Sequence, residues 1–324
     1  KQGLKIIKSK KNLGLKTLLD ICQINTSPSI YHLGYLLGPR INAGGRVGKC
    51  SHGANLLLNK DPKKTFQLAS ELDQFNKERQ LLEKDLLKKI LNQTKDFSKD
   101  PVLIISGENW HEGIIGIVAA RLKDKFNKPV IIISLEGNIG KASARSIVGF
   151  DIGSIIIAAT QNKILLKGGG HKMAGGFSIK IENLDKFKDF VYRRFKNINE
   201  DLTSEKPLLL DSIIAPSAVN IEFYEKIFLL SPFGSGNPEP RFIIEDLKTI
   251  NGKIVGEKHV KSILLGKDGN TIKSIAFNAV DNDLCGYLLK KNNKTFNIAG
   301  KLSLNEWKGQ SNVEFIIDDI SVNK

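Results

Sequence analysis

Cysteine, tryptophan and methionine are scarce in this chain, and long apolar runs are absent. The 324 residues include three cysteines, two tryptophans and one methionine. Cys22, Cys50 and Cys285 are far apart, odd in number and without a Cys-x-x-Cys pair, so neither a disulfide framework nor a zinc site is expected. No apolar run approaches the ~20 residues that cross a bilayer, and no signal peptide is visible. We therefore expect a cytoplasmic protein with reduced thiols and no membrane partner.

Basic residues outnumber acidic ones. The chain has 49 Lys and Arg against 34 Asp and Glu, a formal net charge of +15. Such a surplus favours a polyanionic partner such as nucleic acid. A lysine-rich composition derived from an AT-biased genome would produce the same surplus. Charge alone therefore leaves both explanations open.

The first third of the chain is predicted to be helical, and its length as a whole suggests two or three domains. Residues 1–60 indicate short helices and loops around the string LGPRINAGGRVG. The chain opens in mid-pattern without an initiator Met, so we expect residues 1–60 to be the end of a domain. Asp61 and Pro62 are favourable helix-start residues, and no Gly or Pro follows before Phe97. We predict a connector helix within residues 61–100; the uninterrupted stretch as far as about Phe97 would run roughly 50 Å at 1.5 Å per residue.

Residues 101–197 alternate strand and helix patterns, which is typical of an α/β domain with a mixed sheet. Short apolar or alternating runs predict strands, and longer runs with apolar residues three or four apart predict helices. The predicted strands are PVLIIS, KPVIIIS, GKASARSI and GGFSIKI. The predicted helices are NWHEGIIGIVAARLKDKF and NLDKFKDFVYRRF.

The last part of the chain is predicted to be all-β. After a polar linker over residues 198–206, residues 207–324 contain five alternating runs, with a helix-like DNDLCGYLLKK between the third and fourth. Five strands with a helix in that gap indicate an OB-fold barrel, a fold that commonly binds single-stranded nucleic acid. A small structural β domain is the alternative.

The stretch KGGGHKMAGG is the first candidate site. Five glycines and one histidine lie within the nine residues from Gly168 to Gly176. Glycine allows a ligand to approach the backbone, and successive N–H groups in a turn can bind an anion. His171 could donate a hydrogen bond to a phosphate oxygen. A flexible turn is the alternative.

Three other strings contain residues suited to phosphate. Trp110 and His111 precede a predicted helix whose N-terminus favours anions, although a helix cap with a packed tryptophan fits as well. Ser143 and Arg145 are two apart, so they share one face of a predicted strand and could clamp a phosphate. A solvated strand face is the alternative there. Finally, Arg40, Asn42 and Arg46 surround small residues in a predicted loop, suited to backbone or phosphate contact.

Taken together, these strings resemble a known family. LGPRINAGGRVG, NWHEGIIGIVAARL, GKASARSIVGFDI, GGGHKMAGGFSI, SPFGSGNPEPRF and LNEWKGQSNVEFIIDDI occur in this order, and the resemblance runs over essentially the whole chain. They resemble the bacterial RecJ single-stranded-DNA exonucleases of the DHH phosphodiesterase superfamily. The resemblance implies the end of a DHH domain, a connector helix, a DHHA1 domain and an OB-fold barrel. It also implies a 5′-to-3′ exonuclease of DNA repair and recombination that uses Mn²⁺ or Mg²⁺.

The resemblance also implies roles for individual residues. Gly168, Gly169, Gly170 and His171 would bind the scissile or a neighbouring phosphate, with His171 as the catalytic member. Ser143 and Arg145 match the positions that hold a 5′-terminal phosphate, joined by one arginine, Arg46 in preference to Arg40. Asn42, Trp110 and His111 would line the same cleft. In the barrel, Phe277 and Trp307 are candidates for stacking on bases, with a place in the core as the alternative for either.

The main departure from the family is that the sequence contains no Asp-His-His string; Ser231, where the family often has Glu, and Lys167, where an apolar or aromatic residue is common, are smaller departures. The resemblance places the metal ligands in the DHH domain, most of which is absent here, so we assign no metal ligand and expect these residues alone to be inactive. The implied partners are single-stranded DNA with a 5′ end, a single-strand-binding protein and a RecQ-type helicase. Two alternatives remain: a DHH-type oligoribonuclease or cyclic-dinucleotide phosphodiesterase, and a non-catalytic single-strand-binding or adapter protein.

Overall fold

The computed structural model describes residues 1–93, 97, 99–196, 207–280, 284–289, 295–307 and 310–322. These residues form two compact units, residues 2–205 and residues 206–324. The predicted linker over residues 198–206 lies outside the described residues. No helix among them is both long and apolar enough to cross a membrane.

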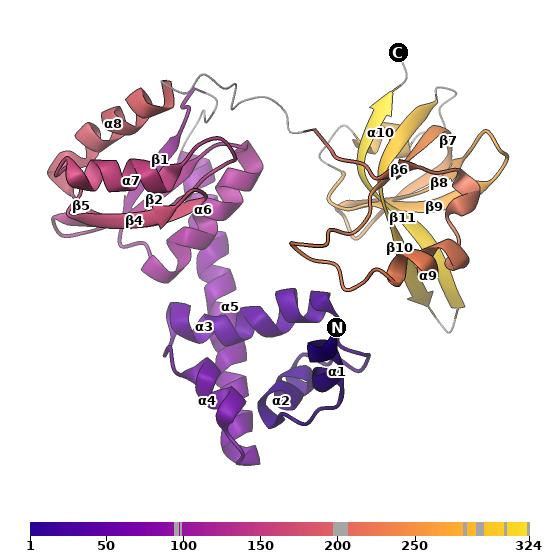
Figure 1. The fold of residues 1–324 in the computed structure, drawn as a ribbon, viewed down its shortest axis with the longest axis horizontal. Helices are drawn as coiled ribbons and strands as arrows, with labels where there is room; N and C mark the ends of the chain where they lie inside the picture. The colour runs from indigo at the N-terminus through magenta and orange to yellow at the C-terminus, as the bar shows by residue number, and fades with distance from the viewer. Residues whose placement is uncertain are drawn as a thin grey trace. The chain divides into compact units, whose positions relative to one another are not determined.

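Short helices pack against one long helix in the first part of unit 2–205 (Figure 1). The elements are α1 (Gln2–Lys8), α2 (Leu13–Ile21), a π-helical segment (His32–Leu37), α3 (Gly38–Val47), α4 (His52–Leu58) and α5 (Pro62–Gln93). Their common core contains Leu18, Leu37, Leu56 and Leu72, each at most 1% exposed. The expectation of a loop around Arg40 was wrong: this string forms α3, with Pro39 in its first turn and Ala43 buried against its neighbours.

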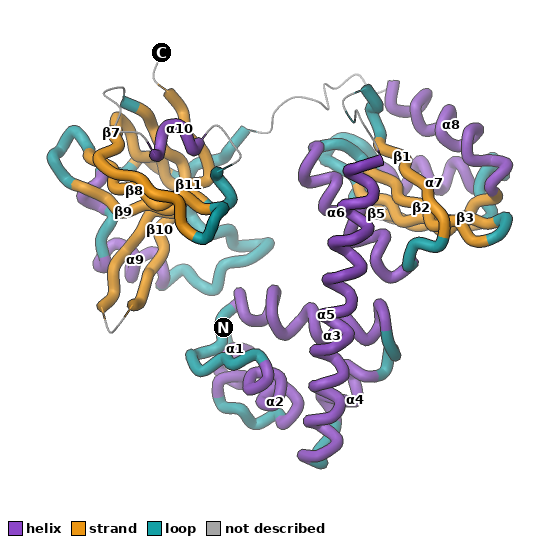
Figure 2. The backbone as a smooth tube through the Cα atoms, turned by 180° about the vertical axis from the view of Figure 1, so that it is seen from behind, coloured by secondary structure: helices purple, strands orange, loops and turns teal. Residues whose placement is uncertain are grey.

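The predicted connector helix is present as α5, with 32 residues (Figure 2). Near its start, Ala69 and Leu72 pack with the short helices. Near its end, Leu86 and Ile90 pack with helix α6 (Glu112–Phe126). Arg121 of α6 also forms an ion pair with Glu83, which is 3% exposed. The helix therefore joins the short helices to the sheet that follows.

A five-stranded mixed sheet forms the second part of this unit. Its strands are β1 (Leu103–Glu108), β2 (Val130–Glu136), β3 (Ile139–Arg145), β4 (Lys167–His171) and β5 (Ala174–Lys180), in the order β1-β2-β3-β5-β4. Only β1 and β2 are parallel. Helix α6 covers one face, packing on residues such as Ile132, and helices α7 (Ile152–Gln161) and α8 (Leu184–Lys196) cover the other.

Two local predictions in this sheet were wrong. The glycine-rich stretch is not a turn, because residues 167–171 form β4 and pair in register with β5. Gly168, Gly169 and Gly170 have no positive φ, so the expected turn-shaped anion nest is not formed. Helix α7 was also not predicted. Its three consecutive isoleucines favour a strand locally, yet Ile155 and Ile156 bury one helical face against the sheet.

The second unit contains the predicted barrel. The five strands are β7 (Phe242–Val255), β8 (His259–Leu265), β9 (Thr271–Ala276), β10 (Phe296–Trp307) and β11 (Gln310–Val322), with α10 (Leu284–Leu289) between β9 and β10. Pairing of β10 with β7 closes the barrel. A two-residue strand β6 (Ser212–Ile213) and helix α9 (Ile221–Phe228), neither predicted, precede it. Alternating residues such as Ile244, Leu264 and Phe315 fill the interior.

Candidate phosphate-binding groove

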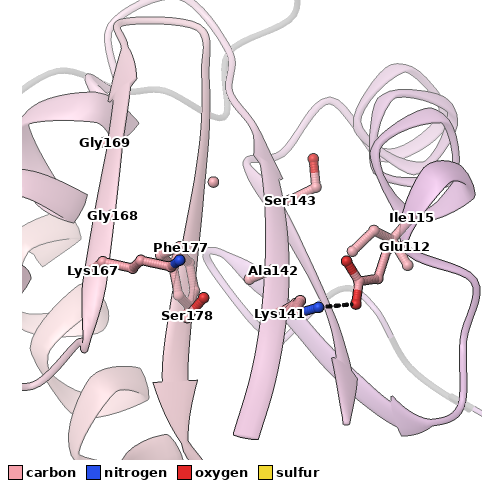
Figure 3. Close-up of a pocket in the computed structure, with 11 residues that line it drawn as sticks. Glu112, Ile115, Lys141, Ala142, Ser143, Lys167, Gly168, Gly169, Phe177 and Ser178 are labelled. Carbon is pink, nitrogen blue, oxygen red and sulfur yellow. Dashed lines mark hydrogen bonds and ion pairs between the residues drawn. The ribbon is translucent and has the colours of Figure 1, made fainter. Parts of the chain in front are cut away.

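The sheet has one open half, where α6 does not cover β5 and β4. There the strand register aligns side chains in rungs across β3, β5 and β4. One rung is Lys141–Ser178–Lys167, the next Ser143–Gly176–Gly169, and the third Arg145–Ala174–His171. Residues two apart on a strand share a face, so all three rungs face the same side. A groove of about 630 Å³ lies over the first two rungs and is bordered by Glu112 and Ile115 of α6 (Figure 3).

Ser143 and Arg145 meet beside helix α6. An Arg145 Nη1–H group donates to Ser143 Oγ at 3.1 Å and to the Ala144 carbonyl oxygen at 2.8 Å. Gly116 makes room for both, because a Cβ there would lie 2.9 Å from Ser143 Oγ and 3.1 Å from Arg145 Nη2. Gly116 therefore allows helix α6 to approach the side chains of Ser143 and Arg145 closely. It brings a hydroxyl and a guanidinium together at the end of the groove.

Arg46 adds a second positive charge at this end. Helix α3 meets the start of α6 at Gly113, where any Cβ would collide with the Arg46 carbonyl oxygen. The Arg46 Nη1–H group donates to the Gly113 carbonyl oxygen at 3.1 Å. Burial, and next the nearby charge of Arg46, lower the pKa of Arg145. A partly buried cation beside another cation is electrostatically unfavourable, so an anion bound between them would relieve the repulsion.

The glycines of β4 and β5 have two different roles. A Cβ on Gly168 would meet Ile156 of α7 at 2.7 Å, and one on Gly170 would meet the Ala174 carbonyl oxygen at 2.5 Å. Gly169 has open space on its groove side, with nothing within 4 Å of an added Cβ. Gly168 and Gly170 are therefore needed for packing. Gly169 leaves bare backbone at the centre of the groove.

His171 ends β4 with an exposed side chain. Its backbone is fixed by helix α7, since a Cβ on Gly153 would lie 2.8 Å from the His171 backbone atoms. The same rung holds Arg145 two strands away. The structure thus brings together Ser143, Arg145, Arg46, Gly169 and His171, from three separate sequence strings.

Four other predicted residues, Arg40, Asn42, Trp110 and His111, are not part of this group. Arg40 faces α5, where its Nε–H group donates to Asp73 at 2.8 Å, so this side chain forms an ion pair within the protein. Asn42 is exposed on α3 one turn before Arg46, which places both on one helix face. The Trp110 ring packs against Gly107 and the core below α6. His111 caps α6, its Nδ1 accepting from the Gly113 N–H group at 3.1 Å.

Four further residues of the first two rungs were not assigned as site residues from the sequence. Lys141 and Lys167 form the outer rung with Ser178, and Gly176 lies between Ser143 and Gly169. The Lys141 Nζ–H group donates to Glu112 at 2.5 Å, and this hydrogen bond raises the pKa of Lys141. Period-two alternation places Lys167, Gly169 and His171 on one face. Finding the partners across the sheet also requires the register of β4, which was interpreted as a turn.

The stacking candidates of the barrel have different outcomes. Phe277 is 52% exposed, and its ring lies edge-on to His259 with centroids 5.1 Å apart. The Asn278 N–H group donates to His259 Nδ1 at 2.9 Å and holds that ring in place. Phe277 is therefore available to a ligand. The Trp307 side chain lies outside what the structure describes.

A divalent metal does not fit the side chains seen here. Within the described ranges, no group of three or more His, Cys, Asp or Glu side chains lies close enough together to hold a metal ion. The open half of the sheet instead contains lysine, arginine and serine, with Glu112 the only carboxylate in the groove lining. Cationic and hydroxyl donors suit an anion rather than Mn²⁺ or Mg²⁺.

Models of two known domain families match the chain. The DHHA1 domain model matches residues 99–197, and the RecJ OB domain model matches residues 210–319. The chain contains a DHHA1 domain and a RecJ OB domain. The groove with its three rungs therefore belongs to the DHHA1 domain, and Phe277 belongs to the RecJ OB domain.

Curated relatives and solved structures extend the similarity to the whole chain. Proteins named single-stranded-DNA-specific exonuclease RecJ are 28% identical in Bacillus subtilis and 31% identical in Haemophilus influenzae, over 99% and 98% of this chain. A crystal structure of Thermus thermophilus RecJ with Mg²⁺ matches 99% of the chain with a TM-score of 0.84 and 26% identity. These matches confirm the resemblance and the fold predicted from the sequence motifs. The chain spans 41% and 57% of the two curated relatives, and 48% of the crystallised one.

Proposed function

We propose that this chain forms the part of a single-stranded-DNA-specific 5′-to-3′ exonuclease that binds the 5′ end and the strand. The observation that carries the proposal is the convergence of Ser143, Arg145 and Arg46 at one end of the groove. A hydroxyl and two guanidinium groups fit a terminal phosphate, which offers several oxygens to donors. The bare backbone at Gly169 lies on the same rung as Ser143, and His171 lies on the same rung as Arg145.

Within this proposal, each part of the groove has a chemical task. Arg145 and Arg46 neutralise the terminal phosphate, and Ser143 orients it through a hydrogen bond. His171, exposed at the end of β4, donates to an oxygen of the next phosphate along the strand and stabilises charge that develops there. The closed barrel of the RecJ OB domain holds the trailing strand, with Phe277 available for stacking. The barrel favours a long strand over the short substrates of the oligoribonuclease alternative.

The relatives support a nuclease reaction that uses divalent metal. The curated relatives are named as single-stranded-DNA-specific exonucleases, and T. thermophilus RecJ has been crystallised with Mg²⁺ and with Mn²⁺. Because the described residues do not fit such a metal, we propose that its ligands lie outside them. The expectation that a single-strand-binding protein or a RecQ-type helicase delivers the strand stays a prediction.

The central test is end recognition. In buffer with EDTA, the 324-residue chain should bind a 5′-phosphorylated oligothymidylate about tenfold more tightly than its 5′-hydroxyl counterpart, the effect of about one charge-assisted hydrogen bond. Arg145→Ala should remove this preference, because the remaining donors no longer enclose the phosphate. The measurement is fluorescence anisotropy, with circular dichroism to verify folding.

A matched control replaces an arginine on the opposite face of the sheet. The Arg193 Nε–H group of α8 donates to the Asp189 carbonyl oxygen within its own helix, so Arg193→Ala should retain the preference. If the Arg145 variant still discriminated between the two ends, Ser143 and Arg145 would not be the terminal-phosphate site. If the unmodified chain showed no preference, the proposal as a whole would fail.

Salt dependence tests the electrostatic part separately. If lysine and arginine contact the strand's phosphates, the logarithm of the binding constant should fall linearly with the logarithm of salt concentration. The expected slope is about −0.7 per phosphate contacted on a single strand. Binding measured at several salt concentrations should therefore give a steep negative slope. An affinity independent of salt would show that the +15 charge reflects composition alone.

A further inference from the structure

The groove extends beyond the end that holds Ser143 and Arg145. Along β3 and β4, the next rung carries Lys141, Ser178 and Lys167 (Figure 3). It lies two residues further, about 7 Å at the usual rise of a strand. The groove of about 630 Å³ lies over this outer rung, and both lysines line it. There is therefore space and positive charge beyond the proposed terminal-phosphate site.

The lining of the outer groove suits phosphate better than a nucleobase. Bases are usually held by stacking on an exposed aromatic ring. The only aromatic residue in the lining is Phe177, whose side chain is buried in the core on the α7 side and is 5% exposed. What the groove presents is two ammonium groups, two serine hydroxyls and the bare backbone of Gly169 and Gly176.

We propose that the groove accepts nucleic acid ends with more than one 5′ phosphate, a 5′-diphosphate or 5′-triphosphate. This inference rests on the proposed function, because it takes Ser143 and Arg145 as the site of the phosphate attached to the sugar. The second and third phosphates extend over Gly169 and Gly176 to Lys167 and Lys141. Among the described residues Lys167 has no carboxylate partner, so its charge is available to the outermost phosphate.

Glu112 limits this site. Its carboxylate accepts from Lys141 at 2.5 Å and borders the same groove. Glu112 pairs with the ammonium group of Lys141, and it adds a negative charge that repels phosphate. Removing the charge of Glu112 should therefore strengthen triphosphate binding, whereas removing the charge of Lys167 should weaken it. Two single variants with opposite expected effects make the proposal easy to contradict.

The experiment compares three oligothymidylates by fluorescence anisotropy in EDTA, which prevents metal-dependent cleavage. One carries a 5′-monophosphate, one a 5′-triphosphate, and the third a 5′-monophosphate on a strand two nucleotides longer, which matches the added charge. The 5′-triphosphate strand should bind about fivefold more tightly than either monophosphate strand. Lys167→Ala should abolish this excess, and Glu112→Gln should increase it. Lys186→Ala, on helix α8 at the opposite face of the sheet, is the control that should leave the excess unchanged.

The outcomes separate the two proposals. A triphosphate strand that binds no more tightly than the charge-matched strand would overturn the extended site. So would an excess that survives in the Lys167 variant. In both cases the preference for 5′-monophosphate over 5′-hydroxyl would remain, because it depends on Arg145. Loss of that preference in the unmodified chain would contradict the proposed function itself.

Discussion

Replacing Gly169 with valine is expected to lower the affinity for 5′-phosphorylated strands at least about tenfold without loss of fold stability. Nothing lies within 4 Å of a Cβ at this position, so the side chain fits. Valine also suits a β-strand and restricts the unfolded chain more than glycine does. Its methyl groups, however, stand in the centre of the groove, where a phosphate would contact the backbone.

The neighbouring glycine provides the matched comparison. A Cβ on Gly170 would lie 2.5 Å from the Ala174 carbonyl oxygen and 2.6 Å from the Gly175 Cα, both backbone atoms of the paired strand. Gly170→Ala should therefore lower the free energy of unfolding by about 2 kcal/mol, a typical result of overpacking. Urea denaturation followed by circular dichroism measures the stability of both variants, and anisotropy measures binding. If Gly169→Val bound phosphorylated strands normally, the central groove would not be the path of the phosphate.

Asp73→Asn is expected to destabilise unit 2–205 by about 3 kcal/mol at neutral pH, the lower end of the range for breaking a buried ion pair. The Arg40 and Asp73 side chains are only 16% and 13% exposed, and their pair joins α3 to α5. An asparagine leaves the Arg40 guanidinium buried without a counter-charge. Arg40 would then face only uncharged acceptors here, the asparagine amide oxygen and the Leu36 carbonyl oxygen at 2.9 Å.

The pH dependence of this effect has a definite sign. Burial alone would raise the pKa of Asp73, but hydrogen bonds from Lys77 and Arg40 outweigh burial, and the pKa lies below its ordinary value. A pKa that is lower in the folded than in the unfolded protein adds stability. This stability is fully present above the pKa of the unfolded protein, about 3.9, and is lost as the pH falls through the pKa of the folded protein. The difference in unfolding free energy between wild type and variant should therefore be constant from pH 7 to 5 and shrink below about pH 4. A difference that persisted at pH 3 would show that the asparagine acts through packing.

The elements predicted correctly from the sequence are those whose local pattern agrees with their surroundings. Helix α5 begins at Pro62 and has no breaker, and the five barrel strands alternate cleanly with the helix α10 in the expected gap. Strands β1, β2, β3 and β5 follow their β-branched or alternating runs. In each case local preference and burial require the same structure, so the pattern alone is sufficient.

The errors occur where tertiary packing overrides local preference. Three glycines in a row indicate a turn, yet β4 is a strand because α7 and β5 approach so closely that Gly168 and Gly170 have no room for side chains. The isoleucines of α7 favour a strand, yet the face of the sheet beneath them is covered by a helix.

The groove was predicted in part, since Ser143, Arg145, Arg46 and His171 were named from separate strings. The outer rung was not, because pairing Lys167 with Lys141 depends on a register that only the folded sheet defines.

The packing of α5 at both ends restricts how the sequence of this unit can change. Helix α3, which carries Arg46, packs near the start of α5, whereas α6, which borders Ser143 and Arg145, packs near its end. A residue added between these two contacts would rotate one end by about 100° relative to the other. Arg46 would then turn away from Gly113 and from Arg145. Exposed positions of α5 are free to vary in identity, but the number of residues between its two contacts is fixed by the geometry of the groove.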